Sequence, residues 1–128
     1  MKVIETKNAP VAIGPYSQAI QVGGMLYTSG QIPMTPDGEL IKGDIREQTR
    51  QVLKNLGEVL GEAGASYNDV IKTTIYITDM DNFLAVNTVY AEFFNEHKPA
   101  RSTVAVKTLP KNVDIEIDCI ARILHYSY

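Results

Sequence analysis

The 128-residue chain is poor in cysteine and histidine, has no tryptophan, and lacks any long apolar run. Cys119 is the only thiol, so no disulfide can form within the chain, which favours a reducing compartment. No stretch approaches the roughly 20 apolar residues of a transmembrane helix. The first residues, Met1 to Asn8, lack the apolar core of a secretory signal. We therefore expect a cytoplasmic protein with a single domain over residues 1–128.

The chain also has little net charge. Twelve basic residues against 15 acidic ones give a net charge of -3, without the clustered basic surface that nucleic acids or anionic membranes need. His97 and His125 have no companion ligands at metal spacing, whereas a zinc site needs three or four. No glycine-rich phosphate loop and no nucleophile elbow occur. We expect no metal, no nucleic acid and no membrane among the partners.

What the chain does have is a succession of strand and helix patterns. Two runs around Gly23-Gly24 predict a β-hairpin over 18–22 and 25–29. A helix is expected to begin at Asp44, an N-cap with Glu47 three residues on, and to end at Gly64. Gly57 and Gly61 within it would allow close packing against a sheet. A second helix is expected over about 81–96, and further strands over 70–78, 102–107 and 113–121.

The strand over 113–121 alternates strictly, which indicates one core face and one polar face. Its odd-numbered residues are apolar, while Asp114, Glu116, Asp118 and Ile120 lie on the other face. The strand over 70–78 is expected to place four residues on the core face and three on the other. The first set is Ile71, Thr73, Ile75 and Ile77, and the second is Val70, Thr74 and Tyr76.

The order of strands, helix, strand, helix and strands predicts an α+β fold of two layers. Right-handed crossovers place both helices on one face of a mixed sheet of about six strands. The other face is left uncovered. Its mixed character fits either a solvated surface or an oligomer interface.

Two charged residues are candidates for chemistry. Arg101 follows Pro99-Ala100 near a strand, and a guanidinium binds a carboxylate with two parallel hydrogen bonds at any relevant pH. An ordinary surface arginine is the alternative. Glu116 lies on a polar strand face with apolar neighbours, where a half-buried carboxylate can orient or deprotonate water. A solvated strand carboxylate is the alternative there.

Four further residues are weaker candidates. Tyr16 follows Gly14-Pro15 on a turn and could simply pack there. Ser29 and Gly30 end a strand, where glycine would let backbone N–H groups approach a ligand, although a plain turn explains them as well. Asn87 lies off the apolar stripe of the second helix and could be only an exposed polar residue.

Several segments in the right order resemble the reactive-intermediate deaminase (RidA) family, and the resemblance covers nearly the whole chain. The matching segments are Ala12-Ile13-Gly14-Pro15-Tyr16-Ser17-Gln18, Tyr27-Thr28-Ser29-Gly30-Gln31-Ile32-Pro33, Asn82-Phe83, Val86-Asn87-Thr88-Val89-Tyr90, Pro99-Ala100-Arg101-Ser102-Thr103-Val104, Leu109-Pro110-Lys111 and Ile115-Glu116-Ile117.

The resemblance implies a chorismate-mutase-like fold assembled as a homotrimer, with active sites in clefts between subunits. It implies hydrolysis of 2-aminoacrylate, 2-aminocrotonate and similar enamine/imine acids to 2-keto acids and ammonia, without a cofactor. Pyridoxal-phosphate-dependent dehydratases, which release such intermediates, are the implied functional partners.

Roles follow for the matching positions. Arg101 would bind the substrate carboxylate, and Glu116 would position the attacking water. Gly30 and Thr103 would offer backbone contacts. Tyr16, Ser29 and Asn87 would line the cleft. Thr103 departs from the cysteine that many relatives carry at this position, which puts any thiol-dependent role in doubt.

Two other functions stay open at this stage. One is an endoribonuclease or translation inhibitor, an activity attributed to some members of the family, although the acidic balance counts against it. The other is a metabolite-binding regulatory trimer whose clefts hold 2-keto acids without turnover.

Overall fold

The computed structural model describes residues 1–125. The chain ends in more aromatic residues than the family resemblance suggests, and two of them, Tyr126 and Tyr128, lie outside the described part.

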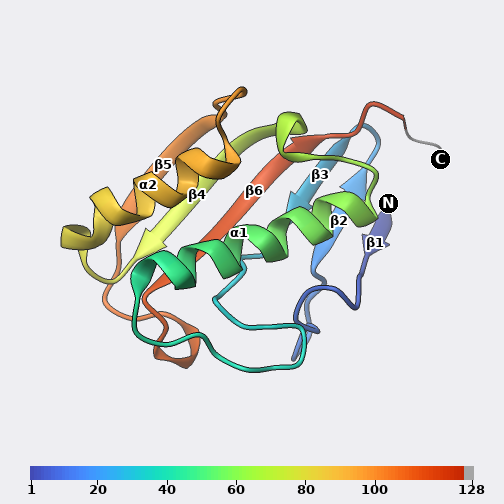
Figure 1. The fold of residues 1–128 in the computed structure, drawn as a ribbon. Helices are drawn as coiled ribbons and strands as arrows, with labels where there is room; N and C mark the ends of the chain where they lie inside the picture. The colour runs from blue at the N-terminus through green and yellow to red at the C-terminus, as the bar shows by residue number, and fades with distance from the viewer. Residues whose placement is uncertain (126–128) are drawn as a thin grey trace.

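A single six-stranded sheet is covered on one face by two helices, as Figure 1 shows. The strands run side by side in the order β1-β2-β3-β6-β4-β5. The strands are β1 (Lys2–Ile4), β2 (Ala19–Val22), β3 (Met25–Thr28), β4 (Val70–Ile77), β5 (Ala100–Ala105) and β6 (Ile115–Arg122), and the helices are α1 (Ile45–Glu62) and α2 (Phe83–Phe93).

The topology follows the crossover rule. β3 and β4 both pair antiparallel with β6, so they are parallel to each other and α1 connects them. β4 and β5 are parallel neighbours joined through α2. Two such units place α1 and α2 on the same side of the sheet (Figure 1), which confirms the predicted two-layer α+β fold.

α1 begins and ends where the sequence predicts. The Asp44 carboxylate accepts a hydrogen bond of 2.9 Å from the Arg46 backbone N–H, and Gly64 adopts a φ of 80° just after the helix. The capping box itself is not formed, because the Glu47 side chain pairs with Arg50 at 2.8 Å instead of returning to the cap.

The two glycines of α1 do not pack against the sheet as expected. Gly57 makes room for the Tyr67 ring, whose Cζ would lie only 2.7 Å from an added Cβ. That ring's hydroxyl donates a 2.7 Å hydrogen bond to the Leu53 carbonyl. Gly61 faces open space, because among residues 1–125 no atom lies within 4 Å of the position that a Cβ would take there, apart from its two chain neighbours and the backbone of α1 itself.

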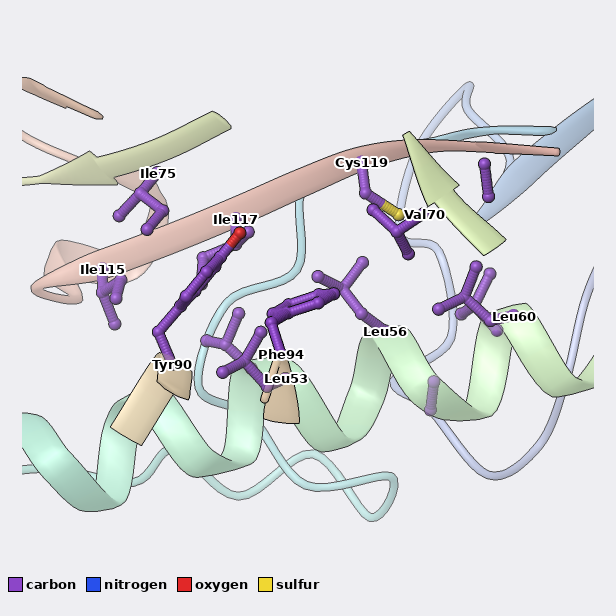
Figure 2. Packing of buried hydrophobic residues seen from close by; sticks show 14 of the residues in the cluster. Leu53, Leu56, Leu60, Val70, Ile75, Tyr90, Phe94, Ile115, Ile117 and Cys119 are labelled. Carbon is purple, nitrogen blue, oxygen red and sulfur yellow. The ribbon is translucent and has the colours of Figure 1, made fainter. Parts of the chain in front are cut away.

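The core fills the layer between the helices and the sheet. Leu53, Leu56 and Leu60 of α1 meet the inward-facing residues of β6, and Tyr90 and Phe94 reach into the same layer from the α2 side (Figure 2). The alternation predicted for β6 is confirmed. Ile115, Ile117, Cys119 and Ala121 are buried.

The predicted faces of β4 are wrong at its first two residues. Val70 is buried and Ile71 is exposed, the reverse of the expectation. The pairing register with β6 shifts between Val70 and Lys72, which indicates a β-bulge. One extra residue reverses the inward and outward alternation on one side of the bulge, so the prediction fails at Val70 and Ile71 but holds from Thr73 to Ile77, with Thr74 and Tyr76 on the other face as expected.

Three element bounds also differ from the sequence prediction. β1, a strand of three residues at the sheet edge, was not predicted. β5 begins at Ala100, so Arg101 lies within the strand and not just before it. α2 begins at Phe83, after a short 3-10 turn over Met80–Asn82, and ends at Phe93, three residues before the predicted end.

Candidate functional site

Two cavities are lined by the residues that the sequence singles out, with the exception of Thr103. One, of about 440 Å³, is lined by Glu116 together with Tyr16, Ser29, Gly30 and Lys111. The other, of about 510 Å³, is lined by Arg101, Asn87 and Tyr90. The candidate residues therefore form two groups within one chain.

Arg101 is held by α2 in a defined orientation. Its Nη1 donates a hydrogen bond of 2.7 Å to Asn87 Oδ1. Its Cζ lies 4.9 Å from the centre of the Tyr90 ring and 5.4 Å from the centre of the Phe83 ring. Aromatic faces attract a guanidinium, and the amide uses only one of its five N–H donors. The remaining donors are free to face solvent or a ligand.

Tyr90 is itself fixed from the sheet side. Its hydroxyl and the Thr73 hydroxyl lie 2.7 Å apart, and Thr73 is fully buried on β4. Thr73 is also the register partner of Arg101 on β5, so β4, β5 and α2 all meet at this point. Among residues 1–125, no carboxylate lies within ion-pair distance of Arg101. The site therefore presents a positioned cation without an anionic partner in the described part of the chain.

Glu116 lies over Gly30. A Cβ added at Gly30 would lie 2.6 Å from the Glu116 Cδ and 2.8 Å from its Cγ, and closer still to Oε2. Backbone hydrogen bonds of 2.9 and 3.1 Å between Gln31 and Ile117 tie the two segments together. Only a residue without a side chain fits beneath the carboxylate, which gives Gly30 a steric role besides any backbone contact.

The Glu116 carboxylate is less acidic than an ordinary glutamate. Burial raises its pKa, and the nearby negative charge of Asp118 raises it further. A carboxylate of this kind holds a proton more tightly than one in water, which suits it to accept a proton from a bound water molecule.

The two groups point to opposite faces of the sheet. Arg101 is paired with the inward-facing Thr73 and contacts α2, so it lies on the helix side. Glu116 is paired with Tyr76 and lies between the buried Ile115 and Ile117, so it lies on the open side. Within one chain the sheet separates the carboxylate-binding candidate from the proton-accepting candidate.

The other predicted site residues divide between the two cavities. Tyr16 is exposed beside Glu116, and Ser29 lines the same cavity although its hydroxyl donates to the Ser17 carbonyl at 2.6 Å. Asn87 lines the Arg101 cavity, where it serves as the hydrogen-bond partner of Arg101. Thr103 lines neither of these two cavities, and its buried Oγ1 has no hydrogen-bond partner in the described part of the chain.

Three residues around these groups were missed by the sequence analysis. The apolar stripe of α2 assigns Phe83 and Tyr90 to the core alone. The spacing of Phe83, Asn87 and Tyr90 along α2 nevertheless puts all three on one helix face, and that spacing could have identified them. Lys111 lines the Glu116 cavity from a turn in which it and Asn112 have φ values of 57° and 55°. Positive φ at two successive residues other than glycine is uncommon.

No group of three or more histidine, cysteine, aspartate or glutamate side chains that could hold a metal ion occurs in residues 1–125. Cys119 is buried on the core face, where burial raises its thiol pKa to about 12. In the same part of the chain, no helix combines the length and apolar character that crossing a bilayer requires.

Comparisons with known proteins agree with the fold and the motifs. The chain matches the family model described as Endoribonuclease L-PSP over residues 6–123. It is 58% identical to a RutC family protein of Pyrococcus horikoshii, with 94% of this chain and 96% of that protein covered. It is 46% identical to Reactive Intermediate Deaminase A, chloroplastic, of Arabidopsis thaliana, with 94% of this chain and 65% of that protein covered.

Solved structures show the same arrangement. The crystal structure of TdcF from E. coli with bound serine matches with a TM-score of 0.91 at 46% identity, covering 95% of this chain and 98% of that one. A Thermotoga maritima protein named as a candidate endoribonuclease matches with a TM-score of 0.95 at 52% identity, covering 98% and 99%. These matches confirm the resemblance, and the chain belongs to the Endoribonuclease L-PSP family, which includes the reactive-intermediate deaminases.

Proposed function

We propose that this protein is a deaminase that hydrolyses 2-imino acids, formed from enamines such as 2-aminoacrylate and 2-aminocrotonate, to 2-keto acids and ammonia. The observation that carries the proposal is Arg101. It is an oriented guanidinium, stacked near two aromatic rings and held by Asn87, without a carboxylate partner in the described residues. A relative named for reactive-intermediate deamination supports the same reaction.

The substrate carboxylate is the group that Arg101 recognises. Each 2-imino acid carries a carboxylate next to the imine carbon, and a guanidinium binds it through two parallel hydrogen bonds. Binding at Arg101 therefore fixes the position of the imine carbon relative to the other catalytic group.

Glu116 supplies the proton transfers. A protonated imine is already electrophilic, so water adds to its carbon while the Glu116 carboxylate takes one proton from that water. The resulting carbinolamine receives that proton on nitrogen and ammonia leaves, while Glu116 takes the hydroxyl proton as the carbonyl forms. The departing ammonia carries this proton away as ammonium, which returns Glu116 to its ionised form. Atoms and charges balance without a cofactor, and a base with a raised pKa suits these steps.

The separation of Arg101 and Glu116 by the sheet leads to the second part of the proposal. One chain cannot present both groups to one small substrate, whereas two copies can, if the Arg101 face of one meets the Glu116 cavity of the next. We place the active sites between subunits of a homotrimer. The open face of the sheet, with exposed Val22, Tyr27 and Val104, offers the apolar surface such an assembly would bury.

Activity is tested by generating 2-aminoacrylate with a pyridoxal-phosphate-dependent dehydratase and following pyruvate release. Wild type should accelerate release over buffer, and Arg101→Ala should raise KM strongly. Arg101→Lys keeps the positive charge but cannot form the two parallel hydrogen bonds of a guanidinium, so it should recover only part of the lost binding. An Arg101→Ala variant as active as wild type contradicts carboxylate binding by Arg101. Tight keto-acid binding without acceleration would indicate a binding protein instead.

The position of the site between subunits is tested by mixing two inactive variants. Arg101→Ala and Glu116→Gln subunits, unfolded together and refolded, should regain about a quarter of wild-type activity, because random assembly pairs an intact Arg101 with an intact Glu116 at one site in four. Each variant refolded alone is the control. A mixture that remains as inactive as its components would place both groups in sites within one chain.

Endoribonuclease activity is the second candidate, favoured by the family description and by the name given to the Thermotoga maritima protein. The test is cleavage of single-stranded RNA by highly purified protein. Cleavage that disappears in Glu116→Gln would support it, whereas cleavage that is unchanged in this variant would point to a contaminating nuclease.

A further inference from the structure

The open face of the sheet carries a second acidic residue close to Glu116. Asp118 lies two residues further along β6, on the same face, at a separation of about 6.6 Å along the strand. Tyr76 of β4 is the register partner of Glu116, and its hydroxyl donates a 3.3 Å hydrogen bond to Asp118 Oδ2. Tyr76 therefore lies across from Glu116 and donates its hydroxyl hydrogen bond to Asp118.

The remaining charged groups on this face explain why Asp118 is the relevant neighbour. Lys72 of β4 and Arg122 of β6 lie further along the sheet, and Arg122 is paired with Asp69 at 3.2 Å. Other titratable groups that line the Glu116 cavity are Tyr16 and Lys111, whereas Tyr27 of β3 lies further along the same face, beside Ile120. Among these groups, Asp118 is the one whose charge raises the pKa of Glu116, after burial.

Tyr76 and Lys72 affect the pKa of Asp118 in the direction opposite to that of burial. Burial raises the pKa of Asp118, whereas the hydrogen bond from Tyr76 and the charge of Lys72 lower it. Burial is the largest of these effects and the pKa of Asp118 is raised overall, so the hydrogen bond from Tyr76 limits that rise and helps the carboxyl group to ionise. Once ionised, Asp118 places a negative charge beside Glu116 on the same face of the sheet.

We propose that Asp118, held by the Tyr76 hydroxyl, is a positioning residue for catalysis: its negative charge strengthens the hold of the Glu116 carboxylate on the proton taken from the attacking water. Asp118 does not touch the substrate. It acts through Glu116, whose carboxylate reaches the cavity. This inference rests on the proposed imine hydrolysis and adds the residues that set the strength of its base.

The pH dependence of the reaction gives the first test. Glu116 must be ionised to accept a proton, so kcat rises with pH as the group loses its own proton. Without the charge of Asp118, the pKa of Glu116 falls. In Asp118→Asn the rising limb of the kcat profile should therefore move to lower pH, and the plateau should drop severalfold because the base is weaker. KM should change little, since Arg101 is untouched.

Three variants separate this effect from a structural one. Asp118→Glu restores the charge and should return the limb toward its wild-type position. Tyr76→Phe removes the hydrogen bond that helps Asp118 to ionise. The rising limb of the kcat profile should therefore move to lower pH, as in Asp118→Asn, but by less. Asp37→Asn, in an exposed loop, removes the same charge at a distance and should leave the profile unchanged. Thermal melting of each variant reports whether it is folded.

A carboxyl NMR titration of Glu116 provides a measurement that does not require turnover. The resonance is assigned by its loss in Glu116→Gln, and its midpoint should be lower in Asp118→Asn than in wild type. An unchanged or higher midpoint, or a limb that stays in place in folded Asp118→Asn, overturns the inference. If the midpoint falls while wild type hydrolyses no imine, the coupling of the two carboxylates stands and the proposed function fails.

Discussion

Replacing Gly30 by alanine tests where the Glu116 carboxylate has to lie. The added methyl group would lie 2.6 Å from the Glu116 Cδ and 2.8 Å from its Cγ. Ordinary contacts of a Cβ lie at 3.4–4 Å, so the carboxylate has to move by about 1 Å. The backbone itself accepts alanine, because Gly30 is not among the glycines with positive φ. The substitution therefore displaces one catalytic group and strains little else.

A displacement of about 1 Å at a catalytic group can lower the rate about 100-fold, which corresponds to about 2.7 kcal/mol in the activation barrier. We expect the loss in kcat and not in KM, since Arg101, the proposed binding group for the substrate carboxylate, is on the other face of the sheet. The cost in stability should stay below about 1 kcal/mol, because the crowded atoms belong to a side chain that can rotate.

Steady-state kinetics in the dehydratase-coupled assay gives the change in kcat, and thermal melting gives the change in stability. Gly61→Ala serves as the matched control, since its methyl group would enter open space and its kinetics should equal those of wild type. A Gly30→Ala enzyme with wild-type kcat would refute the reasoning that Glu116 must lie over Gly30. A rise in KM alone would show that this part of the cavity binds substrate without taking part in proton transfer.

Two further results are expected from the core and the helix. In α1, Gly61→Ala should stabilise the protein by about 1 kcal/mol through helix propensity. Gly57→Ala should destabilise it by roughly 1–2 kcal/mol, because the methyl group displaces the Tyr67 hydroxyl, which is hydrogen-bonded to the Leu53 carbonyl. Urea unfolding of the two variants compares their stabilities directly, and equal effects would contradict the contact between Gly57 and Tyr67. Cys119, with a thiol pKa of about 12, should react with thiol reagents at neutral pH only after unfolding, and rapid labelling of the native protein would show that this strand is accessible.

The fold was largely predictable from the sequence because its strongest signals are periodic. The alternation of β6 and the apolar stripe of α1 each depend on many residues, and both are present in the structure. The faces of Val70 and Ile71 were not predictable, because the bulge adds one residue without any glycine or proline to mark it. β1 was missed because its three residues are too few to show a period.

Candidate site residues could be chosen from the sequence, but their arrangement could not be predicted from it. Family motifs identified Arg101 and Glu116, yet the sequence did not show that they point to opposite faces. That result depends on the register of β5 with β4 and of β4 with β6, which pairs Arg101 with Thr73 and Glu116 with Tyr76. Registers are set by contacts between distant segments, so a local pattern does not contain them.

Tyr90 couples the stability of this protein to its chemistry. Its ring belongs to the hydrophobic core, its hydroxyl meets the buried Thr73, and its face lies 4.9 Å from Arg101. A library selected only for heat resistance would retain Tyr90, and so would one selected only for turnover. Under the proposed function, changes in substrate preference at the Arg101 cavity should therefore arise first through Asn87 and Phe83, which contact Arg101 and are less deeply buried.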